Sequence, residues 1–279
     1  MAKIEEKKEL QNRISVFCET NGISRADFAV KADVSPATLS ALDNGQWDKI
    51  SLSMVKKLTA FIKSTEAGNV FNTSDFQTVQ DLCDTAKKHH LMIGLIGDTG
   101  TGKSTALTYY GNRKNVYRVT FEKSMNPKQF YTTLLRELGV DFEGNINALI
   151  NRAAAELNAK ESPLIIIDEA GKITHSVLLY LHDLREKTKA GCGIVLAGMP
   201  YFKTNLQKFA SKGKEGFSEF LRRINIWHTL NGLNAAEVKY IAEKNGISDK
   251  ERVKELCRIK RFGDLANEIL LDKIMSNAI

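Results

Sequence analysis

The sequence predicts an α/β protein in which helices cover a parallel sheet, with helical segments before and after the sheet region. Between residues 75 and 230, short apolar runs alternate with amphipathic stretches. This alternation is typical of parallel sheets with helices on both faces. The first apolar run leads into a glycine-rich loop, "GLIGDTGTGKSTAL". Residues 231–279 have helical spacing and contain no strand candidate.

Five apolar runs are the expected strands. They are "LMIGLIG" (91–97), "VYRVTF" (116–121), "PLIIIDEA" (163–170), "GIVLAG" (193–198) and "INIWHTL" (224–230). We therefore expect an α/β core over residues 75–230 and a C-terminal helical lid over 231–279. The small, polar stretch 64–74 predicts a linker, and residues 1–63 are expected to form an N-terminal helical domain.

The composition excludes several classes of protein. The 279 residues are 43% hydrophobic and 26% charged, which suits about two folded domains with buried cores. No apolar run is long enough to cross a membrane, and the start "MAKIEEKKEL" lacks the hydrophobic segment of a signal peptide. The four cysteines stand far apart, which argues against a zinc site or a disulfide framework. We expect a cytoplasmic protein with no membrane partner.

The net charge of +7 is distributed unevenly along the chain. Residues 66–199 contain 15 basic and 15 acidic residues, whereas residues 200–230 contain six basic and two acidic ones. A basic segment of this kind suits a polyanionic partner such as DNA, although a solvated basic face has the same composition. The candidate DNA contacts in it are Lys203, Lys208, Lys212 and Lys214.

The glycine-rich loop matches the phosphate-binding pattern GxxxxGK[ST] without a mismatch. Glycines allow backbone N–H groups to surround phosphate oxygens at the start of a helix. Lys103 is expected to reach the β- and γ-phosphates of ATP, and Ser104 to ligate Mg²⁺. A chance glycine-rich turn is a poor alternative, because the loop follows a strand and opens a helix. The expected nucleotide-binding residues here are Gly97, Asp98, Thr99, Gly100, Thr101, Gly102, Lys103, Ser104 and Thr105.

A second acidic element completes the expected nucleotide site. The run "LIIIDEA" ends in Asp168 and Glu169. Asp168 is expected beside the Mg²⁺ ion, and Glu169 is expected to polarise the attacking water. Alternatively, the acidic pair only caps a helix. The motif favours ATP hydrolysis over a small-molecule kinase, which needs no such glutamate and usually has an arginine-rich lid.

Residues 24–47, "SRADFAVKADVSPATLSALDNGQW", have a sequence pattern that is typical of a helix-turn-helix. A first helix is expected from a Ser24 cap to Ala32, then a turn at Asp33 and Val34, and then a second helix that ends at 44–45. The residues expected to face DNA are Ser35, Thr38 and Ser40.

This stretch resembles the Cro/cI-type DNA-binding fold over about residues 8–62. Its second helix contains no Arg or Lys, so its grip on DNA is expected to be weak. A protein-docking module of the same shape is the alternative.

Two arginines, Arg222 and Arg223, precede the last expected strand in "EFLRRINIWHTL". Ring- and filament-forming AAA+ ATPases carry an arginine at this place, which reaches the γ-phosphate of a neighbouring subunit. Such an arginine couples hydrolysis to assembly. We expect Arg223, or failing that Arg222, to act in this way; the alternative is a pair of surface or DNA-contacting arginines.

The order of these features resembles the MuB-like family of AAA+ ATPases, which select the target in phage Mu-type transposition. The features are the helix-turn-helix, the polar linker, "FNTSDFQTVQDLCDTAKKHHLMIGLIGDTGTGKST", "LIIIDEAGKI", "LHDLREKT" and "GIVLAGMP". The resemblance covers nearly the whole chain, and the domain order is more specific than any single motif. It implies a sequence-tolerant ATPase that forms a helical filament or ring on duplex DNA in a bacterial or phage-infected cell. Such a protein presents that DNA to a transposase and stimulates it.

Two positions depart from the wider AAA+ pattern. The strand in "GIVLAGMP" ends with Ala197, Gly198 and Met199, where a polar sensor residue is usual, and Ala266 in "KRFGDLANEI" stands where an arginine is often found. Both predict slow hydrolysis, which suits a switch better than a motor. Two other functions stay open: a replication helper of the helicase-loader or initiator type, and a nucleotide-responsive helix-turn-helix transcription regulator.

Overall fold

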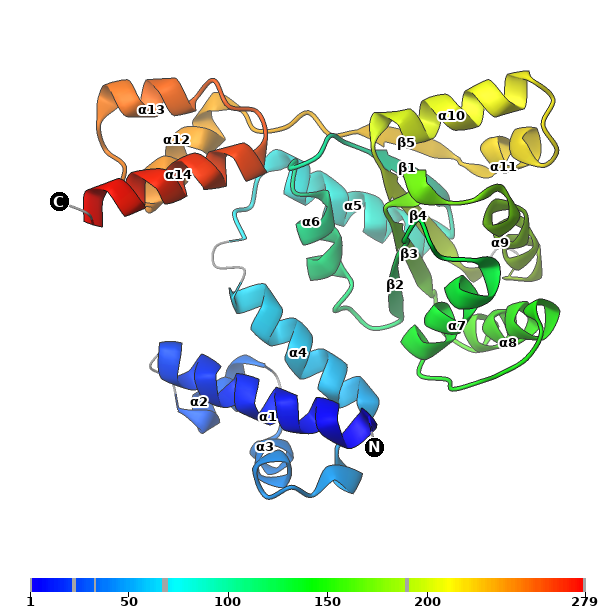
Figure 1. Ribbon diagram of the computed structural model, residues 1–279, viewed down its shortest axis with the longest axis horizontal. Helices are drawn as coiled ribbons and strands as arrows, with labels where there is room; N and C mark the ends of the chain where they lie inside the picture. Colours follow the sequence, from blue (N-terminus) through cyan, green and yellow to red (C-terminus); the bar gives the residue numbers. More distant parts are fainter. Residues whose placement is uncertain (1, 22–23, 33, 67–69, 189–190, 278–279) are drawn as a thin grey trace. The chain divides into compact units, whose positions relative to one another are not determined.

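The computed structural model describes residues 2–21, 24–32, 34–66, 70–188 and 191–277. The chain forms two compact units, Met1–Val70 and Phe71–Ile279. In the described residues the first unit contains helices only, whereas the second contains a five-stranded sheet with helices around it (Figure 1). No described helix has the length and apolar character needed to span a membrane.

The first unit packs its helices around a small aromatic core. Its elements are α1 (Ala2–Asn21), α2 (Arg25–Lys31), α3 (Pro36–Asp43), the 3-10 turn η1 (Trp47–Lys49) and α4 (Leu52–Glu66). Phe28 is fully buried and makes edge-to-face contacts with Phe17 and Phe61.

Helices α2 and α3 occupy the two segments expected from the helix-turn-helix pattern. Ser24 and Asp27 form a reciprocal capping box at the start of α2, and Ser35 caps α3 with Pro36 in its first turn. Asp33, expected in the turn, lies outside the described residues.

The segment expected as a linker is helical at its start. Helix α4 continues to Glu66, although the expected linker begins at residue 64. Residues 64–66 contain neither glycine nor proline, so nothing in them breaks the helix. Helix α5 then begins at Ser74, with Thr73 as its N-cap.

The second unit is built on a parallel sheet of strand order β2-β3-β4-β1-β5 (Figure 1). The strands are β1 (Met92–Ile96), β2 (Val116–Thr120), β3 (Leu164–Asp168), β4 (Gly193–Gly198) and β5 (Ile226–Thr229). Each lies within one of the five expected runs, so the predicted α/β core is confirmed.

Helices cover both faces of this sheet. They are α5 (Ser74–His89), α6 (Lys103–Tyr110), α7 (Pro127–Glu137), α8 (Ile146–Asn158), η2 (Ala170–Lys172), α9 (His175–Thr188), α10 (Pro200–Ser211) and α11 (Phe217–Arg223). Successive side chains of β1 point alternately to the two faces of the sheet. Ile93 and Leu95 share a buried cluster with α5 and α6, whereas Met92 and Ile96 share one with α7 to α11. The inner strands β1, β3 and β4 are therefore buried throughout, as parallel strands covered on both faces require, whereas the edge strands β2 and β5 are partly exposed.

The helices after β5 have a core of their own. They are α12 (Ala235–Lys244), α13 (Lys250–Leu256) and α14 (Phe262–Asn277). We refer to α12–α14 as the lid. Phe71, just before α5, packs against Tyr240 and Phe262 of the lid, with ring centroids 6.1 Å from each.

Two carboxylates join the start of α5 to the beginning of the lid segment. The buried carboxylate of Asp75 accepts the backbone N–H groups of Asn231 at 3.1 Å and Gly232 at 2.8 Å. The Glu237 carboxylate accepts the Ser74 N–H at 2.6 Å. The lid is thus attached to the sheet unit by hydrogen bonds between segments far apart in the chain.

Candidate nucleotide-binding site

Three chain segments meet at the carboxyl edge of the sheet, where ligands of open α/β sheets bind. The loop 97–102 joins β1 to α6, Glu169 follows β3, and Met199 follows β4. Because β4 lies between β1 and β3, these three strand ends are neighbours. The sheet order therefore brings the phosphate-binding loop and the acidic pair together.

The loop itself depends on glycine backbone conformations. Gly100 and Gly102 have φ of 78° and 91°, in the left-handed region that favours glycine. A Cβ on Gly102 would meet no atom within 4 Å, so its backbone angle and not space requires a glycine there. Gly102 has no side chain to cap α6, which leaves the helix N–H groups available to an anion.

Lys103 holds a positive charge inside the loop. Its Nζ donates to the carbonyl oxygens of Gly97 at 2.6 Å and Asp98 at 2.7 Å. Burial lowers the pKa of Lys103 below its usual value, and the nearby carboxylates, Asp168 first among them, offset part of this shift. The Lys103 side chain thus turns back onto the loop that precedes α6.

Asp168 is nearly fully buried, and both of its oxygens are engaged. Oδ1 accepts the Glu169 N–H at 2.9 Å, and Oδ2 accepts Nη2 of Arg118 at 2.9 Å. Arg118 lies on β2, two residues before Thr120, which pairs with Asp168 in the sheet. Arg118 is not among the site residues predicted from the sequence. An arginine within an apolar strand was the available signal, because such a charge needs a partner.

Glu169 stands at the wall of the pocket in an uncommon backbone conformation. Its φ is 58°, in the left-handed region, which is costly for a residue with a side chain. Its carboxylate pairs with Nζ of Lys172 at 3.2 Å, and the Glu169 side chain is 36% exposed. Lys172, in η2, is a second charged neighbour that the sequence analysis did not identify.

The pocket combines the loop, the strand ends and the lid. It has a volume of about 270 Å³, and its lining residues are Thr99, Gly100, Thr101, Gly102, Lys103, Ser104, Thr105, Glu169, Met199, Phe262 and Gly263. The Gly263 N–H donates to the Gly100 carbonyl at 2.8 Å. The lid therefore forms one wall of the pocket through a backbone contact with the loop.

Of the two departures from the AAA+ pattern, only Met199 is among the described residues that line this pocket. Met199 lines it at the end of β4, and its Sδ accepts a hydrogen bond from Oγ1 of Thr99 at 3.5 Å. The lining residues from α14 are Phe262 and Gly263, and Ala266 is not among them.

The available donors fit Mg²⁺ bound together with a nucleotide. Ser104 offers an exposed hydroxyl at the start of α6, and Asp168 offers a carboxylate. Both are oxygen donors, which Mg²⁺ prefers, and Mg²⁺ commonly uses one or two protein ligands plus phosphates and water. The described residues contain no group of three or more His, Cys, Asp or Glu side chains that could hold a metal alone.

The two arginines at the end of α11 differ in their surroundings. Nη1 of Arg223 pairs with Oε1 of Glu186 at 2.6 Å, and its Nε is buried without an acceptor. Arg222 is exposed and has no ion-pair partner in the part of the chain that the structure describes. Arg222 is therefore the more accessible of the two to a neighbouring molecule, whereas the sequence analysis preferred Arg223.

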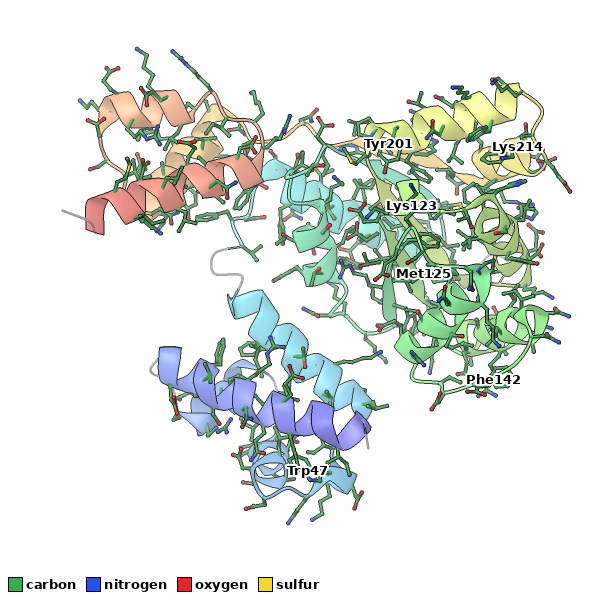
Figure 2. All side chains as sticks on the ribbon, viewed as in Figure 1. Trp47, Lys123, Met125, Phe142, Tyr201 and Lys214 are labelled. Atoms are coloured by element: carbon green, nitrogen blue, oxygen red, sulfur yellow. The ribbon has the colours of Figure 1, made fainter. Side chains whose placement is uncertain are left out.

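The candidate DNA-binding lysines lie on and after α10. Nζ of Lys203 is 5.3 Å from the ring centre of Trp227. Nζ of Lys214, in the turn between α10 and α11, is 4.8 Å from the ring centre of Phe209 (Figure 2). Lys208 and Lys212 are exposed. Two of the four lysines therefore pack on aromatic rings, and two project freely.

The candidate DNA-facing residues of the first unit have mixed roles. Oγ of Ser35 accepts the Thr38 N–H at 3.2 Å, and the two hydroxyls lie 2.9 Å apart. Ser35 is the N-cap of α3, and both Ser35 and Ser40 are exposed, whereas Thr38 is half-buried. The capping role alone accounts for a serine at position 35.

Comparisons with known proteins bear on the second unit. Residues 86–206 match a family model described as an AAA domain. This region is therefore similar to AAA domains. The match and the phosphate-binding loop together indicate a nucleotide-hydrolysing domain. A comparison with curated proteins gave no match.

Solved structures similar to this chain include the ORC2 protein of Aeropyrum pernix with ADPNP and ADP, the same protein with ADP, and Pif1 of a Bacteroides species with ADP-AlF4. The two ORC2 structures are 14% identical, with TM-scores of 0.48, and cover 61% and 65% of this chain and 50% and 55% of their own. The Pif1 structure is 17% identical, with a TM-score of 0.35, and covers 66% of this chain and 48% of its own. This chain thus spans about half the length of each.

Proposed function

We propose that this protein is an ATP-dependent DNA-binding ATPase that assembles on duplex target DNA and delivers it to a transposase. One observation carries the proposal. The AAA domain and the lid share one pocket, because Gly263 donates to Gly100 of the phosphate-binding loop. A nucleotide in that pocket contacts both parts, so ATP and ADP can favour different lid positions. A nucleotide-switched assembly needs such a link.

The chemistry is assigned to four side chains. Lys103 neutralises the β- and γ-phosphates, and Ser104 and Asp168 hold Mg²⁺, which adds further positive charge to the phosphates when bound. The Glu169 carboxylate accepts a proton from the attacking water once it turns from Lys172 to the pocket. Met199 offers no hydrogen-bond donor to the γ-phosphate, which supports slow turnover.

The DNA-binding part of the proposal is supported by charge. Lys208, Lys212 and Lys214 lie close together along the chain at the end of α10, in a segment with few acids. Positive charge of this density favours phosphate contacts that do not depend on sequence. Assembly is supported by the exposed Arg222, which is accessible to a neighbouring subunit. The transposase as partner is supported by the domain order that resembles the MuB-like family.

Electron microscopy with ATP and random-sequence duplex DNA tests this proposal. We expect filaments or rings that require ATP and duplex, and we expect none with Lys103→Ala, which lacks the loop cation. Assembly of that variant at the ATP concentrations that suffice for the wild type would contradict the proposal.

The same DNA-binding measurements separate the two other functions. Preference for single strands would favour a helicase loader, and one tight duplex site would favour a transcription regulator. Stimulation of a transposase on the coated duplex, compared with bare duplex, tests the delivery step.

A further inference from the structure

The ion pair between Arg118 and Asp168 links β2 to the end of β3, beside the nucleotide pocket. Nη2 of Arg118 lies 2.9 Å from Oδ2 of Asp168, and the Asp168 side chain is only 2% exposed. Among the described residues, Nε of Arg118 is buried and has no hydrogen-bond partner, so the pair with Asp168 leaves one donor of this arginine unmet.

Arg118 is the cation paired with Asp168, and the neighbouring acidic residue has a cation of its own. Nζ of Lys172 pairs with the Glu169 carboxylate at 3.2 Å. Lys103, whose Nζ donates to the carbonyl oxygens of Gly97 and Asp98, also senses the Asp168 carboxylate: burial lowers the pKa of Lys103, and Asp168 is the first of the carboxylates that raise it. Removal of Arg118 would leave the buried Asp168 carboxylate without its ion-pair partner.

We propose that Arg118 is a positioning residue that makes divalent-metal binding at Asp168 depend on nucleotide. The inference rests on the proposed function in one respect: it takes the ligand of the pocket to be a nucleotide whose phosphate oxygens bind the metal ion. Arg118 pairs with the buried Asp168 carboxylate, so a free Mg²⁺ ion has to compete with the guanidinium for it. A triphosphate brings several negative charges, and its oxygens supply the ligands that the protein lacks. The arginine thereby discriminates between free metal and metal that arrives with a nucleotide.

The inference predicts that a charge-removing variant gains affinity for metal alone. In Arg118→Met the side-chain length is nearly kept, while the Asp168 carboxylate is left unpaired. We expect about 10 mM Mg²⁺ to raise the melting temperature of nucleotide-free Arg118→Met by about 2–5 °C at constant ionic strength. The wild type should show no such rise. Arg118→Lys, which keeps the charge, should behave as the wild type does.

Two control variants locate the effect. Arg113→Met removes an arginine that pairs with Asp84 at 2.7 Å at the end of α6, and it should gain no response to Mg²⁺. The double variant Arg118→Met, Asp168→Asn should lose the response, because the carboxylate that attracts the metal is gone. Binding of Mn²⁺, followed by electron paramagnetic resonance, provides a second readout that needs neither nucleotide nor turnover.

Several outcomes would overturn the inference. They are a wild type that Mg²⁺ alone stabilises, an Arg118→Met variant without response, and a response that persists in the double variant. If Arg118→Met does not fold, the wild-type titration still tests the inference, as does Arg118→Gln. Binding of a fluorescent ATP analogue to the wild type is measured separately. Its failure would refute the proposed function and leave the metal-only experiment interpretable.

Discussion

Glu169 combines a left-handed backbone, an ion pair with Lys172 and a place in the pocket wall. A residue held in a costly conformation at a site is a reason to expect a chemical role. Glu169→Gln keeps the shape but cannot accept the proton of water. We expect nucleotide binding to remain and phosphate release to fall by about 10²–10⁴-fold.

Matched measurements separate this role from a structural one. Fluorescent-nucleotide binding and the melting temperature should change little in Glu169→Gln, because an exposed ion pair with Lys172 contributes little to stability. A variant that hydrolyses ATP at the wild-type rate would show that another group activates the water.

Lys208 and Lys212 are the freely projecting lysines of the basic segment. If both contact DNA phosphates, Lys208→Ala with Lys212→Ala should reduce the slope of log K against log salt by about two units. The control is Lys239→Ala with Lys244→Ala, which removes the same charge from lid helix α12. Equal slopes in the two double variants would mean that Lys208 and Lys212 belong to a solvated face.

At the scale of elements, the contact between β1 and β5 depends on a missing side chain. Gly94 lies opposite Trp227, and a Cβ on Gly94 would come within 2.3 Å of the indole ring. The new methyl group in Gly94→Ala must therefore push the indole ring of Trp227 aside. We expect a loss of about 1–3 kcal/mol of unfolding free energy, measured by urea denaturation.

Gly191→Ala is the control for this prediction. Among the described residues, apart from its chain neighbours, a Cβ at Gly191 would meet only the Asn158 Oδ1 at 4.0 Å, so the substitution should be nearly neutral. A combined Gly94→Ala, Trp227→Leu variant should recover part of the loss, since the smaller side chain leaves room. Equal stability of the Gly94 and Gly191 variants would refute the steric explanation.

The strands and the phosphate-binding loop could be predicted because both have local signatures. Each buried strand is a continuous apolar run, and the spacing of Gly97, Gly102 and Lys103 is fixed by the phosphates they surround. The pairing of Arg118 with Asp168 could not be predicted, because it joins residues 50 positions apart through strand register. The choice between Arg222 and Arg223 also needed the position of Glu186, on another helix.

At the scale of the whole molecule, an exposed Arg222 that acts on a neighbouring subunit would make the rate of hydrolysis depend on assembly. If Arg222 acts on a neighbouring subunit, activity should rise more steeply than protein concentration, and DNA should increase it. Arg222→Ala should bind ATP but turn over about 10³-fold more slowly or worse. Arg223→Ala, which breaks the Glu186 pair, serves as the control and should keep most of its activity.

Mixing two inactive variants makes this prediction decisive. Glu169→Gln retains Arg222, and Arg222→Ala retains Glu169. Some interfaces in a mixture therefore join an intact pocket to an intact arginine, and phosphate release should partly return. If no ratio restores it although both variants fold and bind ATP, Arg222 does not act across subunits.

Because Asp75 accepts hydrogen bonds from Asn231 and Gly232, the lid cannot be treated as a separate module. The lid is continuous in sequence, which suggests a part that could be cut away or exchanged at residue 231. Its removal would strip a buried carboxylate of both N–H partners and expose the ring of Phe71. A chimaera that takes its lid from another protein must therefore bring residues 71–75 with it. The part that has to be exchanged as a whole therefore consists of two segments that are separate in the sequence, residues 71–75 and the lid.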